Sequence, residues 1–243
     1  MLYFLVALFA STVGSLTGIG GGLIIRPALT VMGFDVGLAT FTSAASVFVM
    51  SCFSIVTRRV WKTDIEMGSL GLLAVGSIAG AFAGAYILSF LGPVTVSILF
   101  ILFLMAIGAL LIAKKHFSVR SISNPWLKIG TGLVVGVTAG LFGIGGGLML
   151  MIALMYLFGS KPKEAVVQSL FVVMLASAAS LVQYTVNGFA DFSLLVYVLP
   201  GSILGGVLGL FIAKRMQENT VVVLLLVIVA AGIASQAFFI ATY

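Results

Sequence analysis

The pentapeptide GIGGG occurs twice in this chain, at residues 18–22 and again at residues 143–147. Each copy lies inside a long hydrophobic stretch that would otherwise be expected to form one helix across a membrane. In a helix interior, glycine is less favourable than alanine by about 1 kcal/mol per residue. Four glycines within five residues are therefore expected to interrupt the helix, and these two interruptions decide how the chain can fold.

The composition predicts an integral membrane protein. Of the 243 residues, 62% are hydrophobic and 7% are charged, and the mean hydropathy is +1.31. Soluble domains carry about a quarter of their residues as charges. The sequence shows no alternating pattern of the kind that outer-membrane β-barrels require, so we expect an all-α fold. Six apolar runs approach the roughly 20 residues of a spanning helix, at 36–57, 68–91, 94–113, 165–186, 192–213 and 220–240.

The second half of the chain repeats the first at a shift of 125 residues, which is 143 minus 18. At this shift GIGGGLIIRPAL (18–29) aligns with GIGGGLMLMIAL, and GSIAGAFAG (76–84) aligns with GSILGGVLG. With one inserted residue, ATFTS (39–43) aligns with AVVQS (165–169). We therefore expect one transmembrane domain, 1–243, made of repeat one (1–117), a basic cytoplasmic linker (118–125) and repeat two (126–243).

Loop charges predict that the two repeats are inverted relative to each other. Loop 58–66 carries three basic residues and its counterpart 187–191 carries none, whereas the loop near Asp35 has no cation and its counterpart has Lys161 and Lys163. Under the positive-inside rule, equivalent loops then lie on opposite sides of the membrane. Inversion requires an odd number of crossings per repeat, so each GIGGG segment is expected to form a re-entrant hairpin beside three spans. A straight helix over 2–33 would be about 48 Å long, against a hydrocarbon core of about 30 Å.

This topology places 11 of the 12 Lys and Arg residues on one face, which we expect to be cytoplasmic. Both termini are then outside the cell (inner) membrane. Because topology explains the net charge of +6, we expect the lipid bilayer, and no nucleic acid, as a partner of the basic residues. We also expect a small anionic substrate, for which the hairpin tips give the reason. The residues on the cation-rich face are Arg58, Arg59, Lys62, Lys114, Lys115, Arg120, Lys128, Lys161, Lys163, Lys214 and Arg215.

The glycines suit an anion site at the hairpin tips. Glycine accepts positive φ and lets a ligand approach the backbone, and the start of the following helix offers free N–H groups with partial positive charge. Inverted symmetry would bring both tips together near the midplane, around a small cavity that fits a compact oxyanion. Pro27 predicts that the returning helix starts near 24–26, which leaves 18–23 unwound. The alternative is that the glycines only allow tight packing. The tip residues are Gly18, Gly20, Gly21, Gly22, Gly143, Gly145, Gly146 and Gly147.

Five further residues could take part in substrate binding. Arg26 lies near a tip at membrane depth, where a cation is costly and usually functional; the alternative is a structural arginine that snorkels or bonds to carbonyl groups. Thr42, Ser43, Gln168 and Ser169 lie at matching positions one to two turns into two spans, and they could bond to substrate or to neighbouring helices. Glycines spaced at i, i+4 and i+8 predict close helix packing instead, and they are Gly76, Gly80, Gly84, Gly201, Gly205 and Gly209.

Several kinds of chemistry are not expected, and we predict no enzyme, cofactor or metal site. The sequence has no G-x-x-x-x-G-K-[ST] motif for ATP. The single histidine, His116, belongs to a basic loop, so it forms neither a buried Ser/His pair nor a metal cluster. No carboxylate lies in the middle of a span, so a carboxylate proton relay has no carrier.

In these motifs the chain resembles the sulfite exporter TauE/SafE family of membrane permeases. The family's halves each carry a G-x-G-G-G stretch, then a proline, then an A-x-x-T-S-like motif. Repeat two departs from this pattern at Ile152, where proline is common, and at Gln168, where threonine is usual. The resemblance implies a secondary transporter or facilitator for sulfite, for sulfonates such as sulfoacetate, or for thiosulfate. An anion channel or a non-transporting scaffold subunit is the alternative, and the direction, the coupling ion and the oligomeric state stay open.

Overall fold

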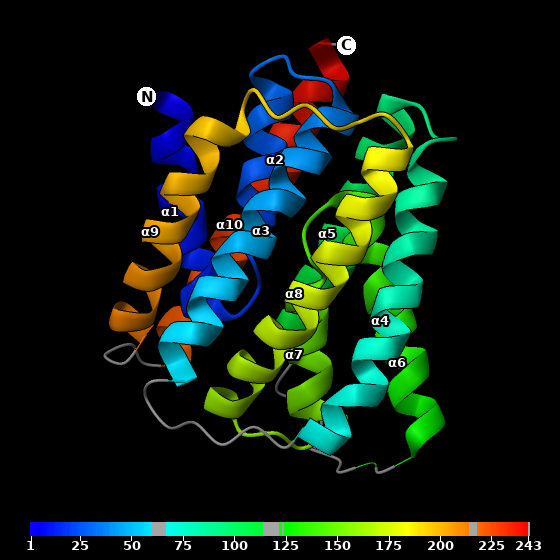
Figure 1. Cartoon of the computed structure of the whole chain (residues 1–243), viewed down its shortest axis with the longest axis vertical. Helices are drawn as coiled ribbons and strands as arrows, with labels where there is room; N and C mark the ends of the chain where they lie inside the picture. Colours follow the sequence, from blue (N-terminus) through cyan, green and yellow to red (C-terminus); the bar gives the residue numbers. More distant parts are fainter. Residues whose placement is uncertain (60–66, 114–121, 123, 214–217, 243) are drawn as a thin grey trace.

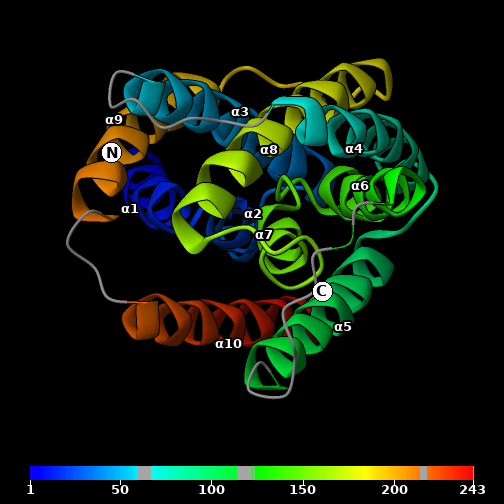
Figure 2. The ribbon, with the colours of Figure 1, turned by 90° about the horizontal axis from the view of Figure 1, so that it is seen from below.

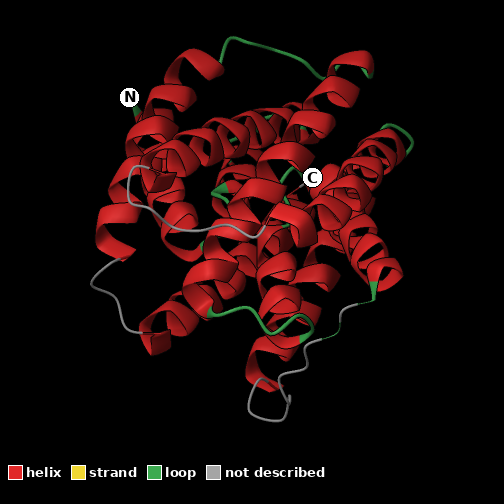
Figure 3. Cartoon of the chain, turned by 60° about the horizontal axis from the view of Figure 1, so that its bottom comes forward, coloured by secondary structure: helices red, strands yellow, loops and turns green. Residues whose placement is uncertain are grey.

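The computed structural model describes residues 1–59, 67–113, 122, 124–213 and 218–242, and within them every regular element is a helix (Figure 3). The predicted all-α membrane architecture is confirmed, and the six expected spans correspond to α3, α4, α5, α8, α9 and α10. The helices are α1 Leu2–Thr17, α2 Gly22–Val31, α3 Val36–Arg59, α4 Met67–Leu88, α5 Pro93–Ala113, α6 Pro125–Phe142, α7 Gly147–Tyr156, α8 Pro162–Val186, α9 Leu195–Ala213 and α10 Glu218–Thr242.

Seven of these helices are long and apolar enough to cross a membrane, one more than the six expected. The additional helix is α6, whose 18 residues give a length of about 27 Å. Its counterpart α1 has 16 residues, and the helices that follow the two GIGGG segments have 10 each. Length and composition alone therefore do not separate the first arm of the second hairpin from a full span.

The contacts at the ends of each hairpin show that it starts and finishes at the same end of the molecule. The N–H of Ile122, just before α6, donates to the carbonyl of Leu157, just after α7, at 3.0 Å. In the other hairpin, the ring of Tyr3 packs edge-on against that of Phe34, with centroids 5.6 Å apart. Figure 1 shows α1 descending from the end that holds both termini and α2 returning to it. Each GIGGG segment therefore reverses the chain inside the bundle.

Close glycine contacts join each hairpin to the opposite half of the chain. A β-carbon built on Gly76, Gly80 or Gly84 of α4 would overlap the carbonyl oxygens of α6, and the glycines of α9 meet α1 in the same way. The predicted packing role of these glycines is confirmed. The contacted carbonyls are those of Ile129, Leu133 and Val137 in α6 and of Phe4, Leu8 and Thr12 in α1, and equivalent members differ by 125 residues. The 125-residue shift found in the sequence therefore recurs in these contacts, in which each hairpin packs against a helix of the other half of the chain.

The short helices α2 and α7 lie in the middle of the fold (Figure 2). Seen from below, α3, α4, α8 and α9 cover one side of them, and α5 and α10 form an outer layer on the other side. In its candidate span α3 has 67% of its residues buried, whereas α10 has 22%. The outward faces of α5 and α10 carry exposed apolar side chains such as Leu102, Met105 and Val227, which suit contact with lipid. The two hairpin tips are thus enclosed by the longer helices.

The cations assigned to one face are only partly covered by the structure. The helix termini that bear Arg58, Arg59, Lys128, Lys161 and Lys163 lie at the end opposite the chain termini, as the topology predicts (Figure 1). The remaining cations of that group lie outside the described residues: Lys62, Lys114, Lys115, Arg120, Lys214 and Arg215.

Candidate functional site

The two GIGGG segments touch each other at the centre of the fold. A β-carbon built on Gly22 would lie 2.6 Å from Cα of Ile144, and one built on Gly147 would overlap the carbonyl of Ile19. These two contacts are equivalent at the 125-residue shift, so the tips cross symmetrically. The expectation that the tips meet is confirmed. The expected gap between them is not present at these contacts, because each glycine lies so close to the isoleucine backbone of the other tip that there is no room for a methyl group.

The tip backbones adopt the conformations for which glycine is needed. Gly18 and Gly20 have φ of 75° and 88°, and Gly143, Gly145 and Gly146 have φ of 65°, 74° and 68°. Positive φ strains residues that carry a β-carbon. The tips are not identical, because Gly21 has φ of −69° where its counterpart Gly146 is left-handed. Positive φ at several tip glycines is therefore confirmed, although the residue before the returning helix is left-handed only in the second tip.

The returning helix starts earlier than Pro27 predicted. Helix α2 begins at Gly22 rather than near 24–26, so the unwound stretch is 18–21 and Pro27 lies inside the helix. A proline at this position removes the bond to the carbonyl of Leu23 and crowds that carbonyl. Leu23 is in the first turn, next to glycines whose backbone can adjust, so the helix tolerates the proline there.

Free N–H groups collect where the two short helices begin. In the described part of the chain, the N–H groups of Gly22 and Leu23 in α2 have no acceptor, nor do those of Gly147 and Leu148 in α7. Each helix start also carries the positive end of the helix dipole, equivalent to roughly half an elementary charge. Because the tips are adjacent, these two positive ends share one region of the interior.

Ser43 and Ser169 fasten the tips to the surrounding helices. Ser43 Oγ, on α3, donates to the carbonyl of Gly143 at 2.8 Å, and Ser169 Oγ, on α8, donates to the carbonyl of Gly18 at 2.8 Å. Each serine thus binds the tip of the opposite repeat. Of the two roles considered for these serines, bonding within the protein is the one that the structure contains, and it satisfies carbonyls that the unwound backbone leaves free.

Thr42 and Gln168, the other matched pair, do not behave alike. The side chain of Thr42 is fully buried, and its hydroxyl has no partner among the described residues. Gln168 is half-buried, and its Oε1 accepts a bond from Ser160 Oγ at 2.9 Å, in the connection that follows α7. Gln168 is therefore engaged at the end of the second hairpin rather than at the tips.

Arg26 projects from α2 into an enclosed aromatic environment. Its side chain is 0% exposed, its Nε donates to Thr40 Oγ1 at 3.3 Å, and its guanidinium carbon lies 4.6 Å from the ring centre of Phe100. The ring centre of Phe142, the residue before the second tip, lies 5.8 Å from the same carbon. Arg26 therefore neither snorkels to the surface nor bonds to a carbonyl in the described part of the chain. Cation–π contacts hold it beside the second hairpin.

The charge of Arg26 has no acidic partner among the residues that the structure describes. Nη1 and Nη2 have no hydrogen-bond partner among the described residues. In the part of the chain that the structure describes, no acidic residue lies in the interior of a helix, because Asp35 and Asp191 lie in connections and Glu164 and Glu218 lie in the first turn of a helix; Asp64 and Glu66 lie outside the described residues. Burying an unpaired charge is costly, and at the centre of a membrane helix the penalty is at least about 2.5–3.5 kcal/mol. An anion that bonded to both nitrogens would relieve this penalty.

The surroundings of Arg26 were not foreseen from the sequence. Phe100 and Phe142 are two of 19 phenylalanines, and nothing in their local patterns marks them as neighbours of a cation. Tyr184, which is fully buried, donates its hydroxyl to the carbonyl of Gly140, two residues before Phe142. Of the residues around Arg26, Thr40 is the one that the sequence could have indicated, because it is a polar residue inside the ATFTS motif beside Thr42 and Ser43.

Comparison with known proteins agrees with the motifs. The profile of the family described as Sulfite exporter TauE/SafE matches residues 3–235. The chain is 30% identical to the probable membrane transporter protein YunE of Bacillus subtilis, over 88% of this chain and 89% of that protein. It is 32% identical to the probable membrane transporter protein MJ0441 of Methanocaldococcus jannaschii, over 75% and 71% of the two chains. A third relative, the probable membrane transporter protein YjnA of Bacillus subtilis, is 27% identical over 88% and 91%.

No solved structure matches the chain. The family match covers almost its whole length, and the proteins it is similar to are named as membrane transporters rather than enzymes. The chain is a multi-pass membrane transporter that belongs to the sulfite exporter TauE/SafE family.

Proposed function

We propose that this protein is a secondary transporter or facilitator of small sulfur-containing oxyanions, and that it binds the anion at Arg26 beside the two glycine tips. The observation that carries the proposal is a fully buried guanidinium whose two terminal nitrogens have no partner among the described residues, in which no helix has a carboxylate in its interior. A transporter needs such a charge to replace the water that an anion loses on entering the membrane.

The chemistry of the site favours a compact oxyanion. A guanidinium presents two parallel N–H groups that match two oxygens of one ligand. The unpaired N–H groups of Gly22 and Gly147 add weaker donors and positive potential nearby. A tetrahedral or pyramidal oxyanion has enough oxygens to bond to both kinds of donor at once. The family description, which names sulfite, makes sulfite the first substrate to test, followed by sulfoacetate and thiosulfate.

The proposed membrane arrangement has six spans and two re-entrant hairpins in inverted repeats. The hydrogen bond between Ile122 and Leu157 supports it, because it joins the two ends of the second hairpin. We place the termini outside the cell membrane and the cation-rich end in the cytoplasm. In a Cys52→Ser background, single cysteines at Gly92 and Lys161 test this with an impermeant thiol reagent: Gly92→Cys should react from outside and Lys161→Cys should not. The reverse pattern would contradict the orientation.

Flux into proteoliposomes tests the function against the alternatives of a channel and a scaffold. A carrier should show uptake of radiolabelled sulfite that saturates with concentration and is inhibited by the other two anions. Arg26→Lys should retain transport with a weaker apparent affinity, and Arg26→Gln should lose about 1.5–3 kcal/mol of binding, roughly 10- to 150-fold in affinity. Flux that does not saturate would indicate a channel, and absence of flux for all three anions in well-folded protein would indicate a scaffold.

A further inference from the structure

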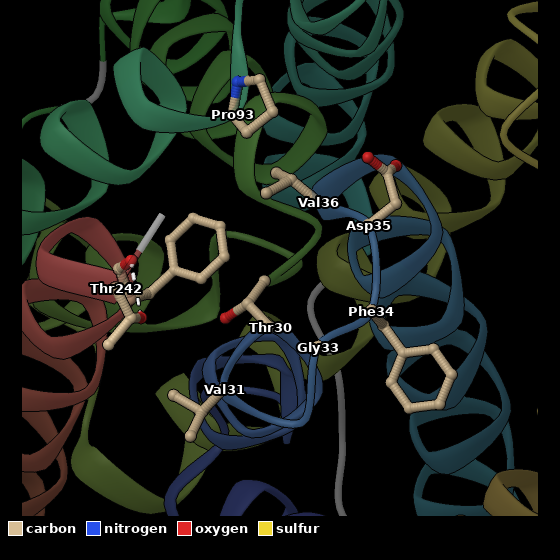
Figure 4. A pocket seen from close by; sticks show the side chains of 9 residues that line it. Thr30, Val31, Gly33, Phe34, Asp35, Val36, Pro93 and Thr242 are labelled. Carbon is tan, nitrogen blue, oxygen red and sulfur yellow. Dashed lines mark hydrogen bonds between the residues drawn. The ribbon is translucent and has the colours of Figure 1, made fainter.

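A pocket of about 410 Å³ opens near the end of the molecule that holds both chain termini (Figure 4). The end of α2, the connection to α3, the start of α5 and the end of α10 line it. Thr30 is 1% exposed and is the most deeply buried polar residue of the lining. Pro93, Phe239 and Thr242 contribute the sides from α5 and α10. The pocket therefore reaches the buried interior at Thr30.

Thr30 and Arg26 lie one turn apart on the same face of α2. Residues at i and i+4 of a helix are neighbours on its surface, with β-carbons about 5–6 Å apart. Because α2 runs from the tips toward the pocket, Arg26 lies one turn deeper in the molecule than Thr30. The path from the pocket to the buried guanidinium is thus about one helical turn long, or about 5.4 Å.

Gln236 of α10 forms a hydrogen bond with Thr30, between the pocket and Arg26. Its Nε2 donates to Thr30 Oγ1 at 2.9 Å, and Thr30 Oγ1 donates to the carbonyl of Pro27 at 2.9 Å. Gln236 is 0% exposed, and its Oε1 has no partner among the described residues. A glutamine in an outer, lipid-covered helix is expected to point toward a polar interior rather than toward lipid.

The register of α5 against α10 places Gln236 beside the aromatic cover of Arg26. A β-carbon built on Gly232 would lie 2.9 Å from Leu104 Cδ1, and one built on Gly108 would lie 3.5 Å from Val229 Cγ1, so the two helices run antiparallel. One turn further along α10 is Gln236, and the matching turn of α5 holds Phe100, whose ring covers the guanidinium.

Ser97 adds a further polar group on the same face of α5. It lies three residues before Phe100 and four after Pro93 of the pocket, it is 0% exposed, and its hydroxyl has no described partner. Four of the eight buried side-chain atoms that lack a partner in the described chain therefore lie between the pocket and the tips. They belong to Arg26, Ser97 and Gln236.

We propose that these groups form an anion access route from the pocket to Arg26, with the Gln236–Thr30 pair as its constriction and selectivity filter. The route rests on the proposed function only in assuming that Arg26 receives the anion. It takes small oxyanions, because it leads to one cation and because the Ser97 hydroxyl and the second amide N–H of Gln236 can donate to an anion, whereas Gln236 Oε1 only accepts. Repeat two has no counterpart of this route, since Met151 and Met155 occupy the positions equivalent to Arg26 and Thr30.

The route can be tested by the reactivity of a buried cysteine at position 236. Cys52 is the chain's single cysteine, so the test uses purified Cys52→Ser, Gln236→Cys protein and measures its mass after treatment with methanethiosulfonate reagents. We expect modification by the anionic sulfonatoethyl reagent to exceed that by the cationic trimethylammonium reagent by roughly tenfold, after correction for their intrinsic rates. Adding Arg26→Gln should remove this preference.

Ser202→Cys is the matched control, because Ser202 is also 0% exposed but lies on α9, bonded to Ser46 Oγ at 2.5 Å. It should react slowly with both reagents. If Gln236→Cys does not fold, Thr30→Cys tests the same route from the pocket side. A cysteine at 236 as unreactive as the one at 202, or one that reacts equally with both charges, would overturn the proposal.

A second experiment separates failure of the route from failure of the proposed function. Gln236→Glu places a negative charge in the constriction and should slow sulfite uptake by at least about tenfold, whereas Gln183→Glu, at the end of α8, should not. Charge-selective labelling without flux of any anion would refute the transport function and leave the route standing. Flux that persists in Gln236→Glu together with an unreactive cysteine at 236 would refute the route alone.

Discussion

The hairpin formed by α1 and α2 and the hairpin formed by α6 and α7 share a backbone design but not a chemistry. Both turn at GIGGG, both contact the other tip through equivalent residues, and a serine of the opposite repeat donates a hydrogen bond to each tip. The returning helices differ in charge, because Arg26 lies on α2 at the position where α7 has Met151. Pro27 is likewise replaced by Ile152.

This difference indicates that the duplication supplies the scaffold and that one repeat supplies the charge. Contacts made by backbone atoms and glycines follow the 125-residue shift, since they depend on close approach rather than on side-chain identity. One guanidinium can bond to two oxygens of a small oxyanion, and without bound anion a second cation at Met151 would add an uncompensated buried charge. Variants in matched positions of the two hairpins can therefore separate shared from one-sided functions.

The largest expected effect is in the shared scaffold. A methyl group at Gly80 or at Gly205 would overlap a carbonyl oxygen of the first arm of a hairpin, and overpacking of this kind costs about 1–3 kcal/mol or more. Gly80→Ala and Gly205→Ala should both lower the thermal unfolding temperature in detergent by several degrees. Gly71→Ala, whose methyl group would meet no atom within 4 Å, is the control and should be neutral. A neutral Gly205→Ala would show that the two halves do not pack alike.

Alanine substitution at the tip should be more damaging in the second hairpin than in the first. Gly20 and Gly145 both have positive φ, which costs a residue with a β-carbon about 1–2 kcal/mol. The new methyl group would lie 2.7 Å from Val173 Cγ1 at Gly145, against 3.1 Å from Val47 Cγ1 at Gly20. We expect both alanine variants to lose transport at equal expression, Gly145→Ala more severely. Wild-type kinetics in both would mean that the glycines serve packing alone.

Substitution of the two serines that donate hydrogen bonds to the tips should lower the stability of the protein moderately and to an equal extent. Removing one buried hydroxyl leaves one tip carbonyl unsatisfied, which costs about 1–3 kcal/mol. Ser43→Ala and Ser169→Ala should therefore destabilise the protein to a similar extent, as measured by denaturation in detergent. Ser43→Ala should leave the affinity for sulfite within about twofold. A loss of affinity without a loss of stability would instead place Ser43 in contact with the anion.

The smallest effect is expected at the mouth of the pocket. Asp35 is exposed and caps α3 by accepting the N–H of Gly37 at 2.7 Å. Asparagine preserves such a cap and removes a negative charge that opposes anion entry. Asp35→Asn should lower the KM for sulfite about twofold at low ionic strength, and the difference should vanish at about 1 M salt. A difference that is independent of salt would exclude an electrostatic cause.

The helices and turns could be predicted from the sequence, whereas the surroundings of Arg26 could not. Hydropathy located the six long helices within a few residues, and the GIGGG copies located both turns, because apolar length and glycine content act locally. It misplaced the start of α2, since the flexibility of the neighbouring glycines outweighs the usual limit set by Pro27. It grouped Gln168 with Ser169 as a candidate substrate-binding residue, although Gln168 accepts a hydrogen bond from Ser160 at the end of the second hairpin. The contacts of Phe100 with Arg26 and of Gln236 with Thr30 could not be foreseen, because they depend on the packing of α5 and α10 against α2.

Equilibrium binding of sulfite to purified protein tests the central claim most directly, because it does not depend on turnover. Isothermal titration should detect one site in the wild type, a weaker site in Arg26→Lys and a loss of roughly 10- to 150-fold in Arg26→Gln. Met151→Gln, the matched change in the second hairpin, should retain the wild-type affinity. Equal affinities in Arg26→Gln and the wild type would contradict the assignment of the buried arginine as the anion site.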